Sequence, residues 1–213
     1  MARRYSRLPS AYLLCFLASC LLAEASRAPK VTRIAGAGRD AKGKVIARDV
    51  LEQATMGVRI AIRYLDGAGR KAALASVPGL AQDLFPEQVK AGEGFLVFAL
   101  ELANDAPGEL IFEPGQGRLL TDRQDAEFPM DYTSLYGVLA KSGPAAPSLE
   151  QVERAVFSRA ATIKPGGSVR KLLVFPGPRD ERFKRLEVRL GALHLPEGDL
   201  DAAFEFRRFE AGP

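Results

Sequence analysis

Apolar and polar residues alternate over short stretches along much of the chain, which is the pattern of β-strands with one buried face. In residues 57–65 every second residue is apolar, and Arg59 and Arg63 occupy the opposite face. Residues 95–103 are apolar on both faces, as expected of a central strand. The turn-favouring residues that begin with Asn104 end that strand.

Further strand-length segments follow and are separated by Gly and Pro. Residues 66–69 (Asp-Gly-Ala-Gly) predict a hairpin turn into a strand over 71–77. One helix signal is present, because Ser148 with Gln151 three residues later forms a capping box that supports about two turns. The other predicted strands cover residues 109–112, 118–121, 156–163, 169–175, 183–190 and 203–209.

This order predicts an all-β fold, an antiparallel immunoglobulin-like sandwich of about seven to ten strands with at most one short helix. We expect a single domain over residues 44–213. Residues 26–43 are rich in Gly, Ala, Arg and Lys and predict a flexible tether with one short strand. Gly36 and Gly38 in this segment are interpreted as turn residues.

The N-terminus has the pattern of a signal peptide over residues 1–25. A basic start is followed by an apolar stretch without charges, and Ala23 and Ala25 place small residues at the cleavage site. The apolar stretch is shorter than the about 20 residues that a membrane-spanning helix needs. We therefore expect an extracytoplasmic protein, periplasmic or at the cell surface.

A second processing route overlaps the first. Leu17, Ala18, Ser19 and Cys20 resemble the lipobox of bacterial lipoproteins, in which cleavage after residue 19 makes Cys20 a lipidation candidate. In the alternative, Cys20 is one more apolar residue of the signal peptide. Mass spectrometry of the mature N-terminus distinguishes the two. No Cys follows Cys20, so the domain contains no disulfide and must be stable through its apolar core.

Charge and residue inventory disfavour several functions. Lys and Arg exceed Asp and Glu by four, and both signs are interspersed, whereas a nucleic-acid-binding domain shows clustered basic residues. His194 is the only histidine, which disfavours zinc sites and His-assisted nucleophiles. We assign no catalytic residue, no metal and no cofactor, and interpret Arg170 and Lys171 as part of an ordinary exposed face.

Four carboxylates lie within ten residues and are the nearest approach to a calcium site. They lack the Asp/Asn/Gly alternation of a calcium loop, so we interpret them as a solvated acidic loop. The four are Asp122, Asp125, Glu127 and Asp131.

The same long connection contains the best candidates for partner binding, Phe128, Met130, Tyr132 and Tyr136. Aromatic residues and Met contribute much of the energy of protein interfaces, and loops on a rigid scaffold commonly carry binding residues. In the competing interpretation, the connection folds down and covers an edge or an open end of the core.

Three segments resemble a family of exported bacterial domains with a telokin-like, immunoglobulin-like fold. They are the strand 95–98 leading to Asn104, residues 119–122, and residues 163–169 followed by 173–176 and 186–188. Two features depart from the family: strand-like sequence precedes Phe95, and the connection after Asp122 is long. The resemblance implies an exported β-sandwich and supplies no catalytic residues.

The sequence therefore predicts a non-enzymatic extracytoplasmic domain that binds another envelope component, expected to be a protein, through loops or a sheet edge. Contact with nucleic acid is not expected, and contact with a membrane is expected only through an N-terminal lipid anchor. The alternatives are an immunoglobulin-like protease inhibitor that projects its 123–147 loop, and a carboxylate-dependent hydrolase.

Overall fold

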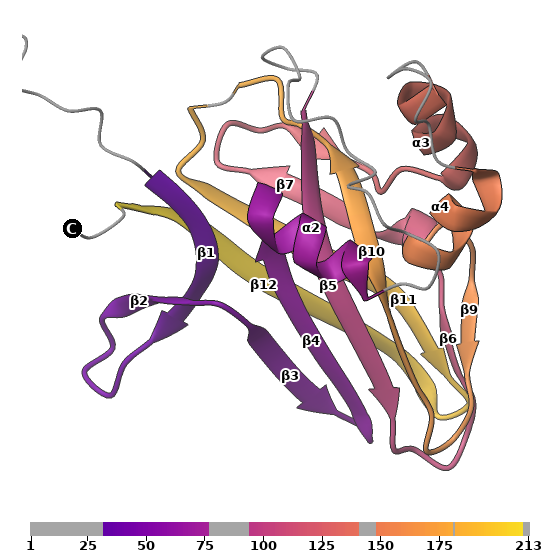
Figure 1. Ribbon diagram of the computed structural model, residues 1–213. Coiled ribbons are helices and arrows are strands. Elements are labelled where there is room, and N and C mark those ends of the chain that lie inside the picture. Colours follow the sequence, from indigo (N-terminus) through magenta and orange to yellow (C-terminus); the bar gives the residue numbers. More distant parts are fainter. Residues whose placement is uncertain (1–31, 77–93, 141–147, 181, 211–213) are drawn as a thin grey trace, which may run out of the picture. The chain divides into compact units, whose positions relative to one another are not determined.

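The computed structural model describes residues 32–76, 94–140, 148–180 and 182–210. The predicted signal peptide and Cys20 lie outside these residues. The chain divides into two compact units, of which Ile34–Phe209 contains nearly all of the described residues. This unit is mostly β and is built on two antiparallel sheets (Figure 1).

The smaller sheet has four strands and contains the predicted central strand. Its order is β10 (Ser168–Pro176), β5 (Phe95–Asn104), β4 (Val58–Leu65) and β3 (Leu51–Thr55), and every neighbouring pair is antiparallel. The strands β10 and β3 therefore form its two edges.

Among the described residues, the larger sheet has eight strands. At its centre lies β11 (Arg185–Leu195), because β12 (Gly198–Glu210) pairs with one side of it and β6 (Leu110–Phe112) and β7 (Arg118–Thr121) pair with the other. The strand β8 (Ala126–Glu127) extends the sheet from β7. The main path of the sheet has the order β2 (Val45–Arg48), β1 (Thr32–Arg39), β12, β11, β6 and β9 (Ala161–Ile163), with β7 beside β11.

The main hydrophobic core lies between the two sheets. Alternate residues of β5 point into it, and the ring of Phe98 lies edge-on, 5.0 Å from the ring of Phe206 in β12. Burying one side chain of this size contributes roughly 1.5–3 kcal/mol. The intervening residues Val97 and Ala99 are buried in a second cluster on the opposite face of the smaller sheet. The prediction of a central strand apolar on both faces is confirmed.

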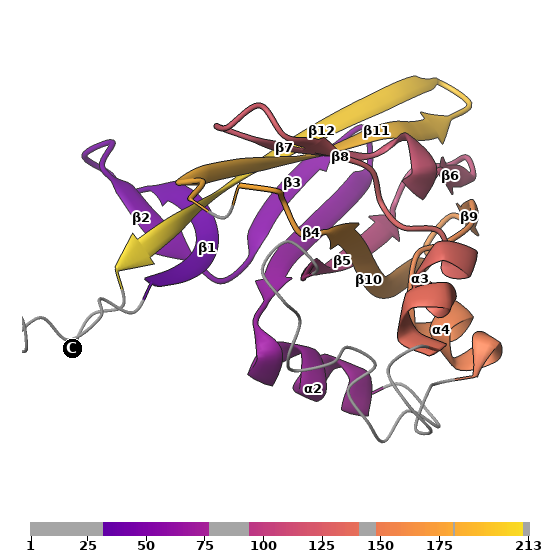
Figure 2. The ribbon, with the colours of Figure 1, turned by 90° about the horizontal axis from the view of Figure 1, so that it is seen from above.

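Three of the described helices form this second cluster with the outer face of the smaller sheet, so that sheet lies between the larger sheet and the helices (Figure 2). They are α2 (Gly67–Ala75), α3 (Tyr132–Leu139) and α4 (Leu149–Ala155), and a short 3-10 helix, η1, covers Pro114–Gln116. The prediction of at most one short helix was wrong. The capping box of Ser148 and Gln151 is present at the start of α4, as predicted.

The helix α2 replaces the predicted hairpin turn and the predicted strand over 71–77. The Asp66 carboxylate accepts a hydrogen bond from the Gly69 N–H at 2.8 Å and caps the helix. The residues after Gly69 are mainly Ala, Lys and Leu, which favour helix, and Leu74 is buried against the sheet. The two glycines, which suggested a turn, belong instead to the first helical turn.

The helix α3 has equally local causes. Asp131 caps it by accepting from the Ser134 N–H at 2.7 Å, and Leu135 and Leu139, one helical turn apart, are both buried. No described helix has the length and hydropathy that crossing a membrane requires.

Two strand predictions also needed correction. Only Ala161–Ile163 of the predicted strand 156–163 form a strand, and Val156 makes a single bridge to Leu172. In the segment predicted as a tether with one short strand, Gly36 and Gly38 lie within β1 and are not turn residues. A Cβ at Gly36 would lie 2.6 Å from the Leu51 Cγ, so close packing explains this glycine.

Candidate functional site

The segment predicted to bind a partner lies along β10, one edge of the smaller sheet. The Met130 N–H donates to the Val174 carbonyl at 2.8 Å, and the Phe157 N–H donates to the Leu172 carbonyl at 2.8 Å. Two carbonyls that β10 would otherwise expose are therefore already bonded. Met130 of this segment and Phe157, which follows α4, thus shield this part of the edge from strand pairing.

The four candidate residues of this segment differ in burial. Met130, Tyr132 and Tyr136 are half-buried against the helix-side cluster. A hydrogen bond from Arg159, whose guanidinium also lies 4.7 Å from the ring centroid, lowers the pKa of Tyr132. Only Phe128 is exposed, at 52%, and the Arg118 guanidinium lies 3.8 Å from its ring centroid. These positions fit the interpretation in which the segment covers the sheet.

The acidic residues of the same segment serve separate backbone contacts. Asp122 accepts from the Lys184 N–H at 3.1 Å, Asp125 accepts from the Asp180 N–H at 3.3 Å, and Asp131 caps α3. Within the described part of the chain, no three His, Cys, Asp or Glu side chains gather as metal ligands.

His194 lies on β11 opposite Asp199 of β12. Its Nδ1 is 2.6 Å from an Asp199 carboxylate oxygen, and this hydrogen bond raises the pKa of His194. The side chain is 35% exposed. The contact is a cross-strand pair near the β11–β12 turn.

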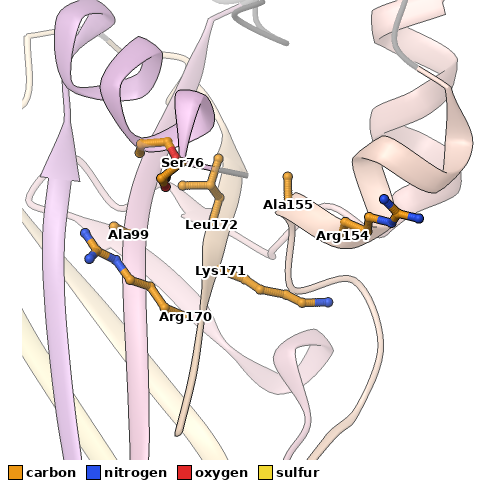
Figure 3. A pocket seen from close by; sticks show the side chains of 8 residues that line it. Ser76, Ala99, Arg154, Ala155, Arg170, Lys171 and Leu172 are labelled. Atoms are coloured by element: carbon orange, nitrogen blue, oxygen red, sulfur yellow. Dashed lines mark hydrogen bonds between the residues drawn. The ribbon is translucent and has the colours of Figure 1, made fainter. Parts of the chain in front are cut away.

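A cleft of about 420 Å³ opens on the helix side of the smaller sheet (Figure 3). Its floor is apolar, and its charged lining residues, Arg154, Arg170 and Lys171, are all cations. An anion with an apolar group has the matching chemistry. Two of the cations are already engaged, however, because Arg154 pairs with Glu150 and the Lys171 Nζ donates to a backbone carbonyl in α4 at 2.9 Å.

The second edge of the smaller sheet, β3, contrasts with β10. Met56 and Gly57 join β3 to β4 with φ of 48° and 75°, the two positive values of a type I′ hairpin turn. In such a hairpin the flanking pair Thr55 and Val58 is hydrogen-bonded, and bonded pairs then alternate along the ladder. The N–H and C=O groups of Glu52 and Ala54 therefore point away from β4.

No strand of the described chain pairs with this outer side of β3. Glu52 and Ala54 are exposed, and the strand contains no Pro or Lys, two residues that commonly block edge pairing. Two exposed apolar residues flank the strand, Val50 at 40% and Met56 at 48%. We call Val50–Met56 the open edge.

The open edge was not among the features predicted from the sequence. The signal was weak, because β3 is short and alternates only partly buried with exposed residues. Its turn also begins with Met56, a residue type that rarely adopts positive φ. The clearest indication of the β3–β4 hairpin in the sequence was Gly57, at the second turn position before the strong β4 pattern.

Comparisons with known proteins add little. No family model matches the chain, and a search of curated proteins finds no match. The crystal structure of the yjhA protein from Bacillus subtilis is similar with a TM-score of 0.39 and 10% sequence identity, over 72% of this chain and 93% of that chain. These comparisons assign the chain to no family.

Proposed function

We propose that this protein is a non-enzymatic, extracytoplasmic binding domain that recognises an envelope protein by adding an extended strand to the open edge. The proposal includes an immunoglobulin-like arrangement of the two sheets and export by the N-terminal signal. The telokin-like resemblance belongs to the same proposal.

The observation that carries the proposal is the difference between the two edges of one sheet. The β10 edge is bonded by backbone N–H groups of Met130 and Phe157, whereas the backbone groups of Glu52 and Ala54 in β3 point away from β4, and no strand of the described chain lies beside them. Figure 1 shows β3 and β10 at opposite edges of the smaller sheet. An exposed edge is a template for another strand, and main-chain hydrogen bonds supply much of the affinity of such complexes.

In vivo photo-crosslinking tests the proposal. A photoreactive residue is placed at Glu52 and, as the matched control, at Arg170, an exposed residue on the helix-side face of the other edge strand. We expect adducts from position 52 in intact cells and none from position 170.

A second variant ties the adduct to strand pairing. Ala54→Pro removes an N–H that faces solvent, so we expect the fold to survive and the adduct from position 52 to disappear. Equal adducts from both positions, or an adduct unaffected by Ala54→Pro in a folded protein, would refute binding at the open edge.

A further inference from the structure

We infer that the strand added at the open edge belongs to a second copy of this chain, with two β3 strands pairing antiparallel about a two-fold axis at Gln53. The inference rests on the proposed function, since it names the partner of the same edge. It follows from the order of residues along Val50–Met56 and from the direction of their backbone groups.

Backbone direction limits the possible registers. Only Glu52, Ala54 and the flanking residues point N–H and C=O groups outward, so a symmetric pair must match outward residues with outward residues. An axis at Gln53 does this, because it places Glu52 of each copy opposite Ala54 of the other. Each of these pairs exchanges two hydrogen bonds, and Gln53 meets its own copy as the intervening non-bonded pair.

Side chains favour this register over its neighbours. An axis at Gln53 also places the exposed Val50 opposite the exposed Met56 of the other copy, which buries apolar surface at both ends. An axis at Glu52 would instead place two carboxylates directly opposite each other, which is unfavourable. An axis at Ala54 would place Glu52 opposite Met56.

Charge is complementary across the proposed interface. On the outer face, Arg59 of β4 lies beside Ala54 of β3 in the register of the hairpin. In the dimer, Glu52 of the second copy lies on the other side of the same Ala54. The small methyl group leaves the two long side chains room to approach, and the two-fold axis forms the pair twice. Arg59 keeps its Asp105 contact at 2.9 Å through Nε.

The pairing joins the two smaller sheets into one sheet across the dimer. One short strand from each copy makes a small interface, so we expect a weak dimer with a dissociation constant between about 10 µM and 1 mM.

Single cysteines test the register. The protein purified from the envelope carries Cys at position 52, 53 or 54 and is oxidised under mild conditions, with the protein lacking an introduced Cys as a control. In a non-bonded antiparallel pair the Cβ atoms lie about 4.5–5.5 Å apart, close enough for a disulfide with small adjustment. We expect rapid dimer formation by Gln53→Cys alone, and its loss when Ala54→Pro is added.

Sedimentation equilibrium tests the charge complementarity without a crosslink. We expect Glu52→Lys to weaken the dimer about tenfold, because Lys then faces Arg59. Glu101→Lys makes the same charge change on the same face in the central strand β5 and should leave the dimer unchanged.

The results separate this inference from the proposed function. Crosslinking through position 52 or 54 instead of 53, or equal effects of the two Lys substitutions, overturns the proposed register. A protein that stays monomeric at 1 mM total concentration (roughly the upper limit above) overturns the second copy as the partner. If adducts from position 52 then contain a different protein, the open edge remains a binding site. If no adduct forms at all, both proposals fail.

Discussion

The side chain of Asn104, fully buried at the end of β5, provides the sharpest test of what holds the fold together. Its amide nitrogen donates to the carbonyls of Gly108 at 2.8 Å and Ile163 at 2.9 Å, and its oxygen accepts from the Ala106 N–H at 3.1 Å. One side chain thus joins the end of the central strand, the turn after it and the end of β9. We predict that Asn104→Ala is among the most destabilising single substitutions.

The magnitude follows from the three bonds. Each net hydrogen bond contributes about 1 kcal/mol, and each buried partner left without one costs about 1–3 kcal/mol. Water entering the vacated space offsets part of this cost, so we expect a loss of about 3–5 kcal/mol. For a domain of this size that corresponds to a fall in Tm of roughly 10 °C. Urea denaturation followed by far-UV circular dichroism measures the loss at an unchanged m-value.

Two further variants sharpen the Asn104 test. Asp105→Ala removes an exposed neighbour whose side chain contacts only Arg59 among the described residues, and should change stability little. Asn104→Asp keeps the acceptor but turns a carboxylate toward two carbonyls, so its destabilisation should be larger at pH 7 than at pH 4. A loss below about 1 kcal/mol for Asn104→Ala would show that the three bonds do not matter for stability.

Three further predictions follow. An NMR titration should give His194 a pKa above its ordinary value, and Asp199→Asn should abolish this shift. The stabilisation from the pair is full below the unfolded pKa of about 6.5 and is lost as pH rises through the higher folded pKa. An unshifted pKa of His194 would refute the contact. At the β3–β4 turn, Met56→Asn should stabilise the protein by about 0.5–1 kcal/mol, measured by urea denaturation. Gly57→Ala should destabilise it, because φ of Gly57 is 75° and a Cβ there would lie 2.9 Å from neighbouring backbone. Changes of the opposite sign would contradict the type I′ turn. Leu135→Ala in α3 should cost about 2–5 kcal/mol by thermal denaturation, and a smaller loss would show that α3 does not cover the sheet.

The strands of the fold were predictable where their burial pattern was strong. The apolar run over 95–103 corresponds to β5, and the alternation over 57–65 corresponds to β4. These strands were predictable because successive residues of a strand point to opposite faces, so a residue's position along the strand determines which face it occupies. The capping box at Ser148 was predictable for a similar reason, because both of its hydrogen bonds lie within four residues.

The two missed helices had local signals that competed with others. Asp66 is favourable both as a helix cap and as a turn residue, and the glycines after it favour a turn over a helix. In α3, Leu135 and Leu139 lie on one helical face, but neighbouring aromatic residues made the segment resemble a binding loop. In each case tertiary packing determines that the segment is a helix, since the helices are buried against an apolar sheet face formed by distant residues.

The candidate site could not be predicted, because an open edge is a property of the whole sheet. Whether β3 is exposed depends on which strands lie beside it, and no pattern within five residues records that. The aromatic segment was predicted to bind a partner because aromatic residues and Met contribute much of the energy of protein interfaces. In the fold, Met130, Tyr132 and Tyr136 are half-buried against the helix-side cluster, and partner binding by these residues stays a prediction.

The difference between the edges is itself an argument for function. Met130 and Phe157, from the segments before α3 and after α4, donate backbone hydrogen bonds to part of β10, whereas the same sheet ends at β3 with no such protection among the described residues. A sheet with two unprotected edges could grow at both ends into an open chain of molecules, which is a route to aggregation. Because Leu172 and Val174 of β10 are already bonded, β3 is the edge at which strand addition is favoured, and addition there stops after one partner. A two-fold pair about Gln53 is then a closed assembly, because each copy has used its open edge at β3.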